Sequence, residues 1–401
     1  MLYRKMPKTG DELSILGFGC MRFPMEDGQI DEARAIAQVR SAIDSGVNYV
    51  DTAWPYHGGE SEPLLGRALK DGYRERVRIA TKLPTWLINS REDMDRYLNA
   101  QLERLGTDHI DYYLVHALDG PAWDAIKALG VCEFLDQAKK DGRIVNAGFS
   151  FHGLPEDFSR IVDGYPWIFC QIQYNYLDQQ YQAGTAGLKY AASKGLGVVI
   201  MEPLRGGNLG LAAAPPAVAA IWDEARTRRT PVEWALRWVW NHPEVTVVLS
   251  GMNEEAHIEQ NLAIAGEAHA GSLTGEELEL VDRAGKKYQE LMQVGCTGCA
   301  YCMPCPAGVK IPICFDFFNK MHMFGNVEEA KFMYIAFVSG ITGSGEPGFA
   351  SQCVACGECL DKCPQHIAIP EMMERVAAEM EGPNFQEQVA GIKEHFKTGL
   401  K

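Results

Sequence analysis

Short apolar segments that end at a polar residue recur along the first two thirds of this 401-residue chain, and they constrain its fold most strongly. The residues from Val47 to Val50 favour a β-strand, and the segment stops at Asp51. Similar segments end at the polar residues Lys82, His116, Ser150, Gln171 and Ser250, and one more ends at Met201. Helix-length mixtures of polar and apolar residues separate most of them, in units of roughly 30 residues. This alternation predicts an α/β fold of the (β/α)8 TIM barrel type.

Eight strand and helix units can be counted, beginning with a strand in LSILGFGCMRFP. Helices are expected at 31–45, 61–70, 91–105, 121–141, 155–163, 185–194, 231–241 and 254–266. In such a barrel, the active site is built from residues at the carboxyl ends of several strands. We therefore expect Asp51, Lys82 and His116 to lie close together.

The composition narrows the classes of function. A net charge of −15 disfavours nonspecific binding to nucleic acid or to an anionic membrane surface. The basic start MLYRKMPKTG is not followed by an apolar segment, and the longest apolar run is broken by Pro215 and Pro216. We expect no signal peptide and no membrane span. Eight of the 12 cysteines lie in two clusters with ligand spacing, which favours a reducing cytoplasm over a disulfide-bonded secreted protein.

Tyr56 follows Asp51 closely, in a turn-rich loop, and adds a proton donor to the strand-end residues. A carbonyl that receives hydride needs a proton donor beside its oxygen. An ammonium group lowers the pKa of a phenol, a carboxylate holds that ammonium, and a histidine can orient the carbonyl. Taken singly, these residues also fit a loop aromatic, a solvated lysine and a core histidine. Their joint position at strand ends favours the catalytic interpretation.

The motifs DTAWPY, TKL, YLVH and GFS resemble those of the aldo-keto reductase family, over roughly residues 10–268. The resemblance implies that Tyr56 is the general acid, that Lys82 and Asp51 tune it, and that His116 orients a small carbonyl substrate. It also implies NAD(P)H as the cofactor.

The nucleotide contacts that the resemblance implies are partly altered. Ser150 and Gln171 match the residues that contact the nicotinamide amide, whereas Phe151 replaces a common Asn and Met201 replaces an aromatic residue. The glycine-rich loop from Leu204 to Gly210, which includes Gly207, is either a pyrophosphate-binding loop or an ordinary turn. The positions near the adenosine phosphate are Ser250, His257 and Asn261, without the family's Lys and Arg pair. The choice between NAD and NADP therefore stays open.

Two cysteine runs dominate the last third of the chain. Cys353, Cys356, Cys359 and Cys363 with Pro364 have the Cys-x2-Cys-x2-Cys-x3-Cys-Pro spacing of bacterial [4Fe–4S] proteins. The other run is nearly the same but has a shorter last gap: Cys296, Cys299, Cys302, Cys305 and Pro306. Four-cysteine zinc sites are the rival interpretation, but the three equal spacings and the Cys-Pro pair favour two [4Fe–4S] clusters.

The usual exchange of the fourth ligand predicts how the cysteines divide. One cluster takes Cys296, Cys299, Cys302 and Cys363, and the other takes Cys353, Cys356, Cys359 and Cys305. Cys314 is an alternative to Cys305, although a lone cysteine among Ile and Phe is more typical of a core. Cys20, Cys132 and Cys170 fit core positions for the same reason. The helical segment between the runs resembles the α-helical ferredoxins of respiratory iron–sulfur subunits.

The expected organisation is a reductase barrel over 1–270, a linker helix over 271–294 and a mainly helical dicluster ferredoxin-type domain over 295–401. Hydride carries two electrons, whereas a [4Fe–4S] cluster takes one at a time, so the two halves must be reconciled. The clusters can be structural or sensory beside a carbonyl reductase. They can also exchange electrons with a redox partner protein through a bound flavin or a radical-forming substrate, although no flavin motif is found. A noncatalytic barrel is the third alternative, and the complete set of four residues argues against it.

Overall fold

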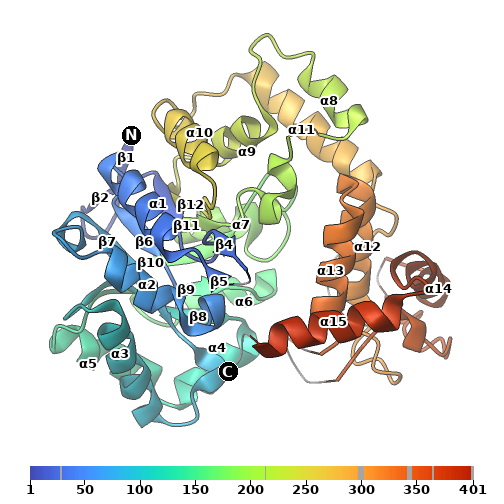
Figure 1. The fold of residues 1–401 in the computed structure, drawn as a ribbon, viewed down its shortest axis with the longest axis horizontal. Coiled ribbons are helices and arrows are strands. Elements are labelled where there is room, and N and C mark those ends of the chain that lie inside the picture. Colours follow the sequence, from blue (N-terminus) through green and yellow to red (C-terminus); the bar gives the residue numbers. More distant parts are fainter. Residues whose placement is uncertain (28, 213, 297–301, 341–345, 364, 399–401) are drawn as a thin grey trace. The chain divides into compact units, whose positions relative to one another are not determined.

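The computed structural model describes residues 1–401 except 28, 213, 297–301, 341–345, 364 and 399–401 (Figure 1). The chain forms two compact units. The first unit contains residues 1–212 and 229–281, and the second contains residues 213–228 and 282–401. In these described ranges, we find no helix with the length and apolar character needed to cross a lipid bilayer.

Eight parallel strands of the first unit close into a barrel, which confirms the predicted (β/α)8 fold. Most of their residues are buried, as expected for parallel strands that helices cover. The closed order is β10, β11, β12, β3, β6, β7, β8 and β9. The strands are β3 (Leu16–Gly19), β6 (Tyr49–Asp51), β7 (Arg78–Leu83), β8 (Ile110–Leu118), β9 (Ile144–Phe151), β10 (Phe169–Gln173), β11 (Gly197–Met201) and β12 (Val245–Ser250).

Helices follow these strands and surround the barrel (Figure 1). α3 illustrates how the sequence sets their ends: a capping box joins Ser90 to Asp93 at its start, and left-handed Gly106 ends it. The helices of this unit are α1 (Glu32–Asp44), α2 (Ser61–Ala68), α3 (Arg91–Leu105), α4 (Gly120–Ala128), α5 (Val131–Lys140), α6 (Pro155–Val162), α7 (Gly184–Ser193), α9 (Pro231–Trp240) and α10 (Glu255–Ala265).

A hairpin that the sequence analysis did not predict covers the amino ends of the strands. It pairs β1 (Tyr3–Lys5) with β2 (Glu12–Ser14). Met6 and Leu13 are fully buried in the same apolar cluster as the barrel interior. Closing this end leaves the carboxyl ends of the strands for the functional side chains. A second small hairpin, β4 (Met25–Glu26) with β5 (Gln29–Ile30), follows β3.

Two predicted boundaries were wrong. The single helix expected over 121–141 is two helices, α4 and α5, because Gly130 adopts a left-handed conformation with φ 83° between them. The strand expected to stop at His116 continues to Leu118, with an irregular register after Val115 and a positive φ of 54° at Ala117.

The second unit is mainly helical, as predicted. Its core gathers aromatic and sulfur-containing side chains, among them Phe315, Phe318, Tyr334 and Met373. Its helices are α8 (Pro216–Trp222), α12 (Ile311–Phe324), α13 (Val327–Val338), α14 (Ile369–Met380) and α15 (Phe385–Thr398), and α11 (Gly275–Glu290) begins in the first unit and ends in the second. The sequence analysis missed α8, which begins at the prolines that interrupt the apolar run. The predicted domain boundaries at 270 and 294 stay a prediction.

Candidate functional site

The four residues predicted to be catalytic meet at the carboxyl ends of β6, β7 and β8. The Lys82 ammonium donates to Asp51 Oδ1 at 2.7 Å and to the Thr52 carbonyl at 2.7 Å. It also donates to the Tyr56 hydroxyl at 3.4 Å. The rings of Tyr56 and His116 meet edge to face with centroids 6.5 Å apart. β6, β7 and β8 are neighbours in the barrel, so residues from three separate parts of the sequence form one cluster.

Burial and charge set the protonation of these groups. Burial raises the pKa of the Tyr56 hydroxyl, and the nearby Lys82 ammonium opposes that rise. Burial acts to lower the pKa of Lys82, but Asp51 and Tyr56 outweigh it, so the pKa is raised and the ammonium is retained. Burial raises the pKa of Asp51, and Lys82 offsets part of this effect. Burial, with Lys82 and His152, holds the pKa of His116 well below its usual range, so this imidazole is neutral at neutral pH.

Two buried polar atoms of the cluster have no hydrogen-bond partner among the described residues: Asp51 Oδ2 and His116 Nδ1. Buried polar atoms are normally paired, and exceptions require an explanation. Trp86 lies beside His116 with ring centroids 5.0 Å apart, yet its own surface is 53% exposed. The side of the cluster at His116 therefore carries an exposed aromatic surface.

The residues predicted to contact a nicotinamide amide are neighbours on adjacent strands. Ser150 of β9 and Gln171 of β10 are in register, and both are nearly fully buried. Ser150 Oγ accepts a hydrogen bond from the Ala117 backbone, and Gln171 Nε2 lies 3.8 Å from the Met201 sulfur. Gln171 Oε1 has no partner within the described residues. Phe151 instead packs in the core against Phe158 and offers no polar group.

The glycine-rich loop after β11 includes a short 3₁₀ segment, η4 (Arg205–Gly210). Gly206 and Gly207 both have positive φ, at 71° and 99°. A Cβ atom at Gly207 would meet no described atom within 4 Å, so open space lies next to this backbone. The geometry leaves room for a ligand to approach the loop.

The residues expected near an adenosine phosphate lie after β12. Asn261 donates to Ser250 Oγ at 3.0 Å, and both are buried, whereas His257 is exposed on α10. The sequence analysis missed a basic residue here, because Arg34 comes from α1. Its guanidinium binds Glu255 at 2.8 Å and also pairs with Glu254 at the start of α10. This cation is already matched by two carboxylates.

Two more groups lie close to the cluster around Lys82. His57 follows Tyr56 and accepts a hydrogen bond from the Phe23 backbone at 3.1 Å. Cys20, assigned only to the core, is fully buried, and the charges of Asp51 and Lys82 act on its thiol. The position of Cys20 directly after β3 indicated that it lies near the site, because the sequence analysis had already assigned the ends of the other strands to that site.

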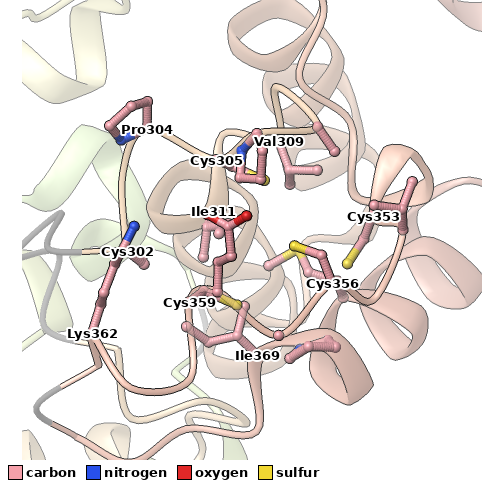
Figure 2. Close-up of a pocket in the computed structure, with 17 residues that line it drawn as sticks. Cys302, Pro304, Cys305, Val309, Ile311, Cys353, Cys356, Cys359, Lys362 and Ile369 are labelled. Atoms are coloured by element: carbon pink, nitrogen blue, oxygen red, sulfur yellow. The ribbon is translucent and has the colours of Figure 1, made fainter.

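Five cysteines of the second unit line one pocket. Figure 2 shows Cys353, Cys356 and Cys359 around it, with Cys302 and Cys305 from the first run on its other sides. Positive φ values at Ala355 and Gly357, 53° and 81°, turn the chain between these cysteines. Burial raises the pKa of the Cys359 thiol, as do Cys353, Cys356 and Cys305. The thiols of the group predicted to share one cluster are therefore close to one another.

The other predicted group is more deeply buried. Cys302 and Cys363 are each 9% exposed in the apolar core, and Cys296 packs against the same core. Cys299 lies outside the described residues. Cys314 is fully buried in α12, where its thiol donates to the Gly348 carbonyl at 3.6 Å, and it does not line the pocket.

Side chains of α12 and α13 fix the segments that lead into the two cysteine runs. Asn319 Oδ1 accepts from the backbones of Gln293 and Val294, and its Nδ2 donates to the Val294 carbonyl at 2.7 Å. The Tyr334 hydroxyl accepts from the Ala350 backbone at 2.9 Å. These contacts order the backbone just before Cys296 and Cys353.

The cysteines that line the pocket offer the thiol donors that an iron–sulfur cluster needs. In the described part of the chain, no three His, Cys, Asp or Glu side chains converge tightly enough to hold one metal ion. A four-cysteine zinc site needs every sulfur about 2.3 Å from one ion. The thiolates of a [4Fe–4S] cluster bind different irons, so their sulfurs surround a volume, as the pocket-lining cysteines do. The donor set of thiols in an apolar pocket therefore fits an iron–sulfur cluster.

The fold and the sites define an oxidoreductase barrel joined to an iron–sulfur domain. The chain belongs to the aldo/keto reductase family, whose profile matches residues 15–285. The profile described as "4Fe-4S dicluster domain" matches residues 295–368.

Individual relatives agree with this assignment. L-galactose dehydrogenase from Arabidopsis thaliana is 28% identical over 299 residues, which cover 70% of this chain and 92% of that protein. Aldo-keto reductase AKR11C1 from Bacillus halodurans, in its holo form, superposes with a TM-score of 0.60 at 25% identity, over 71% of this chain and 96% of that one. The thermostable aldo-keto reductase Tm1743, in complex with the inhibitor epalrestat, gives 0.59 at 26% identity, over 71% and 100%.

Proposed function

We propose that this protein reduces a small carbonyl compound with NAD(P)H and that Tyr56 is the proton donor. The observation that carries the proposal is the position of the Lys82 ammonium, which contacts both Asp51 and Tyr56. A phenol becomes a useful acid only where its phenolate is stabilised. Lys82 supplies that stabilisation, and the buried Asp51 holds Lys82 in place.

The residues divide the work around one oxygen atom. NAD(P)H, when bound, supplies a hydride to the carbonyl carbon. The Tyr56 hydroxyl gives its proton to the carbonyl oxygen, and Lys82 stabilises the phenolate that remains. His116, neutral at working pH, orients the same oxygen through a hydrogen bond. The exposed face of Trp86 offers an apolar wall for the rest of the substrate.

Gln171 supports the nucleotide part of the proposal. Its Oε1 is buried and unpartnered among the described residues, so it can accept a hydrogen bond from the nicotinamide carboxamide. Ser150 lies in register beside it, and Met201 packs against it. The loop from Leu204, with Gly207, has room for the pyrophosphate.

At the other end of the nucleotide, Ser250, His257 and Asn261 surround the proposed adenosine side. The ion pairs of Arg34 with Glu254 and Glu255 reduce the attraction of its guanidinium for a phosphate.

For the second unit, we propose two [4Fe–4S] clusters with exchanged fourth ligands. Cys305 would join Cys353, Cys356 and Cys359, and all four line one pocket, which Cys302 also reaches. Cys363 would join Cys296, Cys299 and Cys302, as the usual exchange of the fourth ligand predicts.

A second candidate function is single-electron exchange with a redox partner protein, through a bound flavin or a radical-forming substrate. The dicluster domain favours it, since such domains carry electrons one at a time. Anaerobic titration with NADH and with NADPH, followed at the cluster absorption, separates the alternatives. Bleaching by the nucleotide supports electron exchange, and unchanged absorption supports a structural or sensory role. A bound flavin is tested for by extracting the protein and measuring the fluorescence of the extract.

Tyr56→Phe tests the reductase mechanism. The phenyl ring keeps the packing but has no proton to give, so turnover should fall by about 10² to 10⁴. Nucleotide binding and the cluster spectra should be nearly unchanged. Full turnover by Tyr56→Phe with every carbonyl compound that the native protein reduces would contradict the mechanism.

Metal analysis tests the cluster assignment. Protein prepared without oxygen should contain about eight iron atoms and about eight acid-labile sulfides per chain, because each cluster holds about four of each. Zinc without sulfide would refute the assignment.

A further inference from the structure

A buried polar network outside the four catalytic residues surrounds the strand that carries Lys82. At its centre is Glu62, in the first turn of α2, whose side chain is fully buried. Its Oε1 accepts hydrogen bonds of 2.7 Å from Thr81 Oγ1 and of 2.7 Å from Gln101 Nε2. Its Oε2 pairs with the Arg104 guanidinium at 3.3 Å. Each carboxylate oxygen is therefore satisfied, as a buried charge requires.

Gln101 connects this carboxylate to the backbone of the catalytic lysine. Besides Glu62, its Nε2 lies within hydrogen-bond distance of the Lys82 carbonyl, at 3.0 Å, and of Thr81 Oγ1, at 3.1 Å. Its Oε1 accepts from the Tyr113 hydroxyl at 2.9 Å. Gln101 is fully buried, and its amide has partners on both sides. The peptide that carries Lys82 is thus held from outside the barrel.

Arg104 extends the network to the loop that carries Tyr56. Its guanidinium lies 3.4 Å from the centroid of the Trp54 ring. Trp54 stands between Asp51 and Tyr56 in the sequence, and the rings of Tyr97 and Trp54 meet edge to face, with centroids 4.8 Å apart. The cation is therefore shared between a buried carboxylate and an aromatic ring of the catalytic loop.

The residue next to Glu62 holds the opposite side of the catalytic cluster. Ser61 Oγ donates to the Cys20 carbonyl at 2.9 Å and shares a 2.8 Å hydrogen bond with Thr52 Oγ1. The carbonyl of Thr52 is itself an acceptor for the Lys82 ammonium. One turn of α2 consequently binds the side chain of Thr81, which precedes Lys82, and the side chain of Thr52, whose carbonyl Lys82 binds.

We propose that Glu62, Gln101 and Arg104 are positioning residues that set the distance between the Lys82 ammonium and the Tyr56 hydroxyl. This inference rests on the proposed reductase function. At 3.4 Å, that contact is longer than an ordinary hydrogen bond, so a small shift of either residue changes how strongly Lys82 stabilises the phenolate. Displacements of about 1 Å around a reacting group can cost on the order of 10² in rate.

Thr81→Val is the sharpest perturbation, because it removes one hydroxyl from the network and keeps the side-chain shape. Thr81→Ser keeps the hydroxyl and is the matched rescue. Thr246→Val is the structural control: Thr246 is also a buried barrel threonine, and its Oγ1 accepts from the Val198 backbone at 3.2 Å near the amino end of β11.

The readout is the pKa of Tyr56 itself. Each variant is titrated by ultraviolet difference absorption against the same variant with Tyr56→Phe added, so that the difference reports this one phenol. We expect a higher pKa in Thr81→Val than in the native protein, because Lys82 is less well placed to stabilise phenolate. Thr81→Ser and Thr246→Val should leave it unchanged. An equal pKa in Thr81→Val and Thr246→Val would overturn the inference.

Turnover of para-nitrobenzaldehyde with NADH and with NADPH separates this inference from the proposed function. Reduction needs protonated Tyr56, so kcat falls as pH rises through the Tyr56 pKa, and Thr81→Val should move that fall to higher pH while lowering kcat about tenfold or more. A native protein that reduces neither this aldehyde nor any other carbonyl compound would refute the proposed function, while the titration would still decide the positioning role.

Arg104→Lys and Arg104→Met provide a second, independent pair. Lys keeps the charge beside Glu62, and Met keeps apolar packing over Trp54 but leaves the carboxylate without its cation. Arg104→Met should raise the Tyr56 pKa more than Arg104→Lys does. The same pKa in both variants and in the native protein would exclude a role for Arg104.

Discussion

Replacing Lys82 by Met should lower the stability of the protein, and adding Asp51→Asn should restore stability without restoring activity. Met preserves most of the apolar stem, but it removes the donor at 2.7 Å from Asp51 Oδ1. Asp51 is 2% exposed, and its Oδ2 already has no partner among the described residues. The variant therefore leaves a buried carboxylate without a counter-ion. Breaking a buried pair in this way costs about 3 to 5 kcal/mol of unfolding free energy.

A double-mutant cycle isolates that cost. Asp51→Asn combined with Lys82→Met removes both charges and should recover much of the lost stability. The double variant should still lack activity, because Tyr56 has lost the ammonium that stabilises its phenolate. The coupling between the two sites should be at the upper end of the roughly 0.5 to 3 kcal/mol seen for contacting residues.

Tryptophan fluorescence during urea unfolding is a suitable assay, because seven of the eight tryptophans belong to the first unit and only Trp222 belongs to the second. The signal therefore reports mainly on the barrel. A Lys82→Met protein as stable as the native one would refute the view that the ion pair compensates for the burial of Asp51. So would a double variant that is no more stable than Lys82→Met alone.

Three further predictions follow from the sites. Cys363→Ser should alter the electron paramagnetic resonance of both clusters more than Cys314→Ser does, and equal damage would count against the ligand assignment. NADPH should be preferred to NADH only modestly, because the nearby cation, Arg34, is already paired with Glu254 and Glu255. Each charge-assisted contact to a phosphate is worth about 1.5 to 3 kcal/mol, so the loss of such contacts removes most of the discrimination. A dissociation constant for NADPH about 10³ times lower than that for NADH would show that other basic residues bind the phosphate. Burial holds the pKa of His116 well below that of an unfolded histidine, so the contribution of this neutral imidazole to stability is fully present above about pH 6.5 and is lost as the pH falls below that value. In urea titrations at several pH values, His116→Gln should therefore lose less stability on acidification than the native protein does. An unchanged pH dependence would contradict the lowered pKa of His116.

The barrel and the meeting of the four strand-end residues could be predicted because both follow from local patterns. Each strand ends where apolar residues give way to polar ones, and a parallel barrel brings all those ends to one side. The sequence separation of Asp51, Lys82 and His116 did not matter, since strand order alone makes them neighbours. The cysteine spacing was similarly informative, because the number of residues between two cysteines limits how their thiols can be arranged around a metal cluster.

The remaining parts depend on contacts that no local pattern records. Glu62 and Gln101 are 39 positions apart, and nothing in either segment marks them as partners. Arg34 meets Glu255 across 221 positions, so a search after the last strand could not find it. The break at Gly130 was a local signal, but a glycine within a helical pattern is also tolerated at a cost of about 1 kcal/mol.

The second unit is built from two separate parts of the chain, which determines where the protein can be cut. It includes residues 213–228, which the chain reaches between β11 and α9, before the barrel is complete. Glu224 in that segment binds Arg283 through two hydrogen bonds of 2.7 Å. A fragment cut after Val281 would therefore keep residues 213–228 but lack Arg283 and the rest of the unit to which this segment belongs. Truncation at the end of the barrel should consequently expose the segment between β11 and α9, so the barrel cannot be separated from the second unit by a single cut.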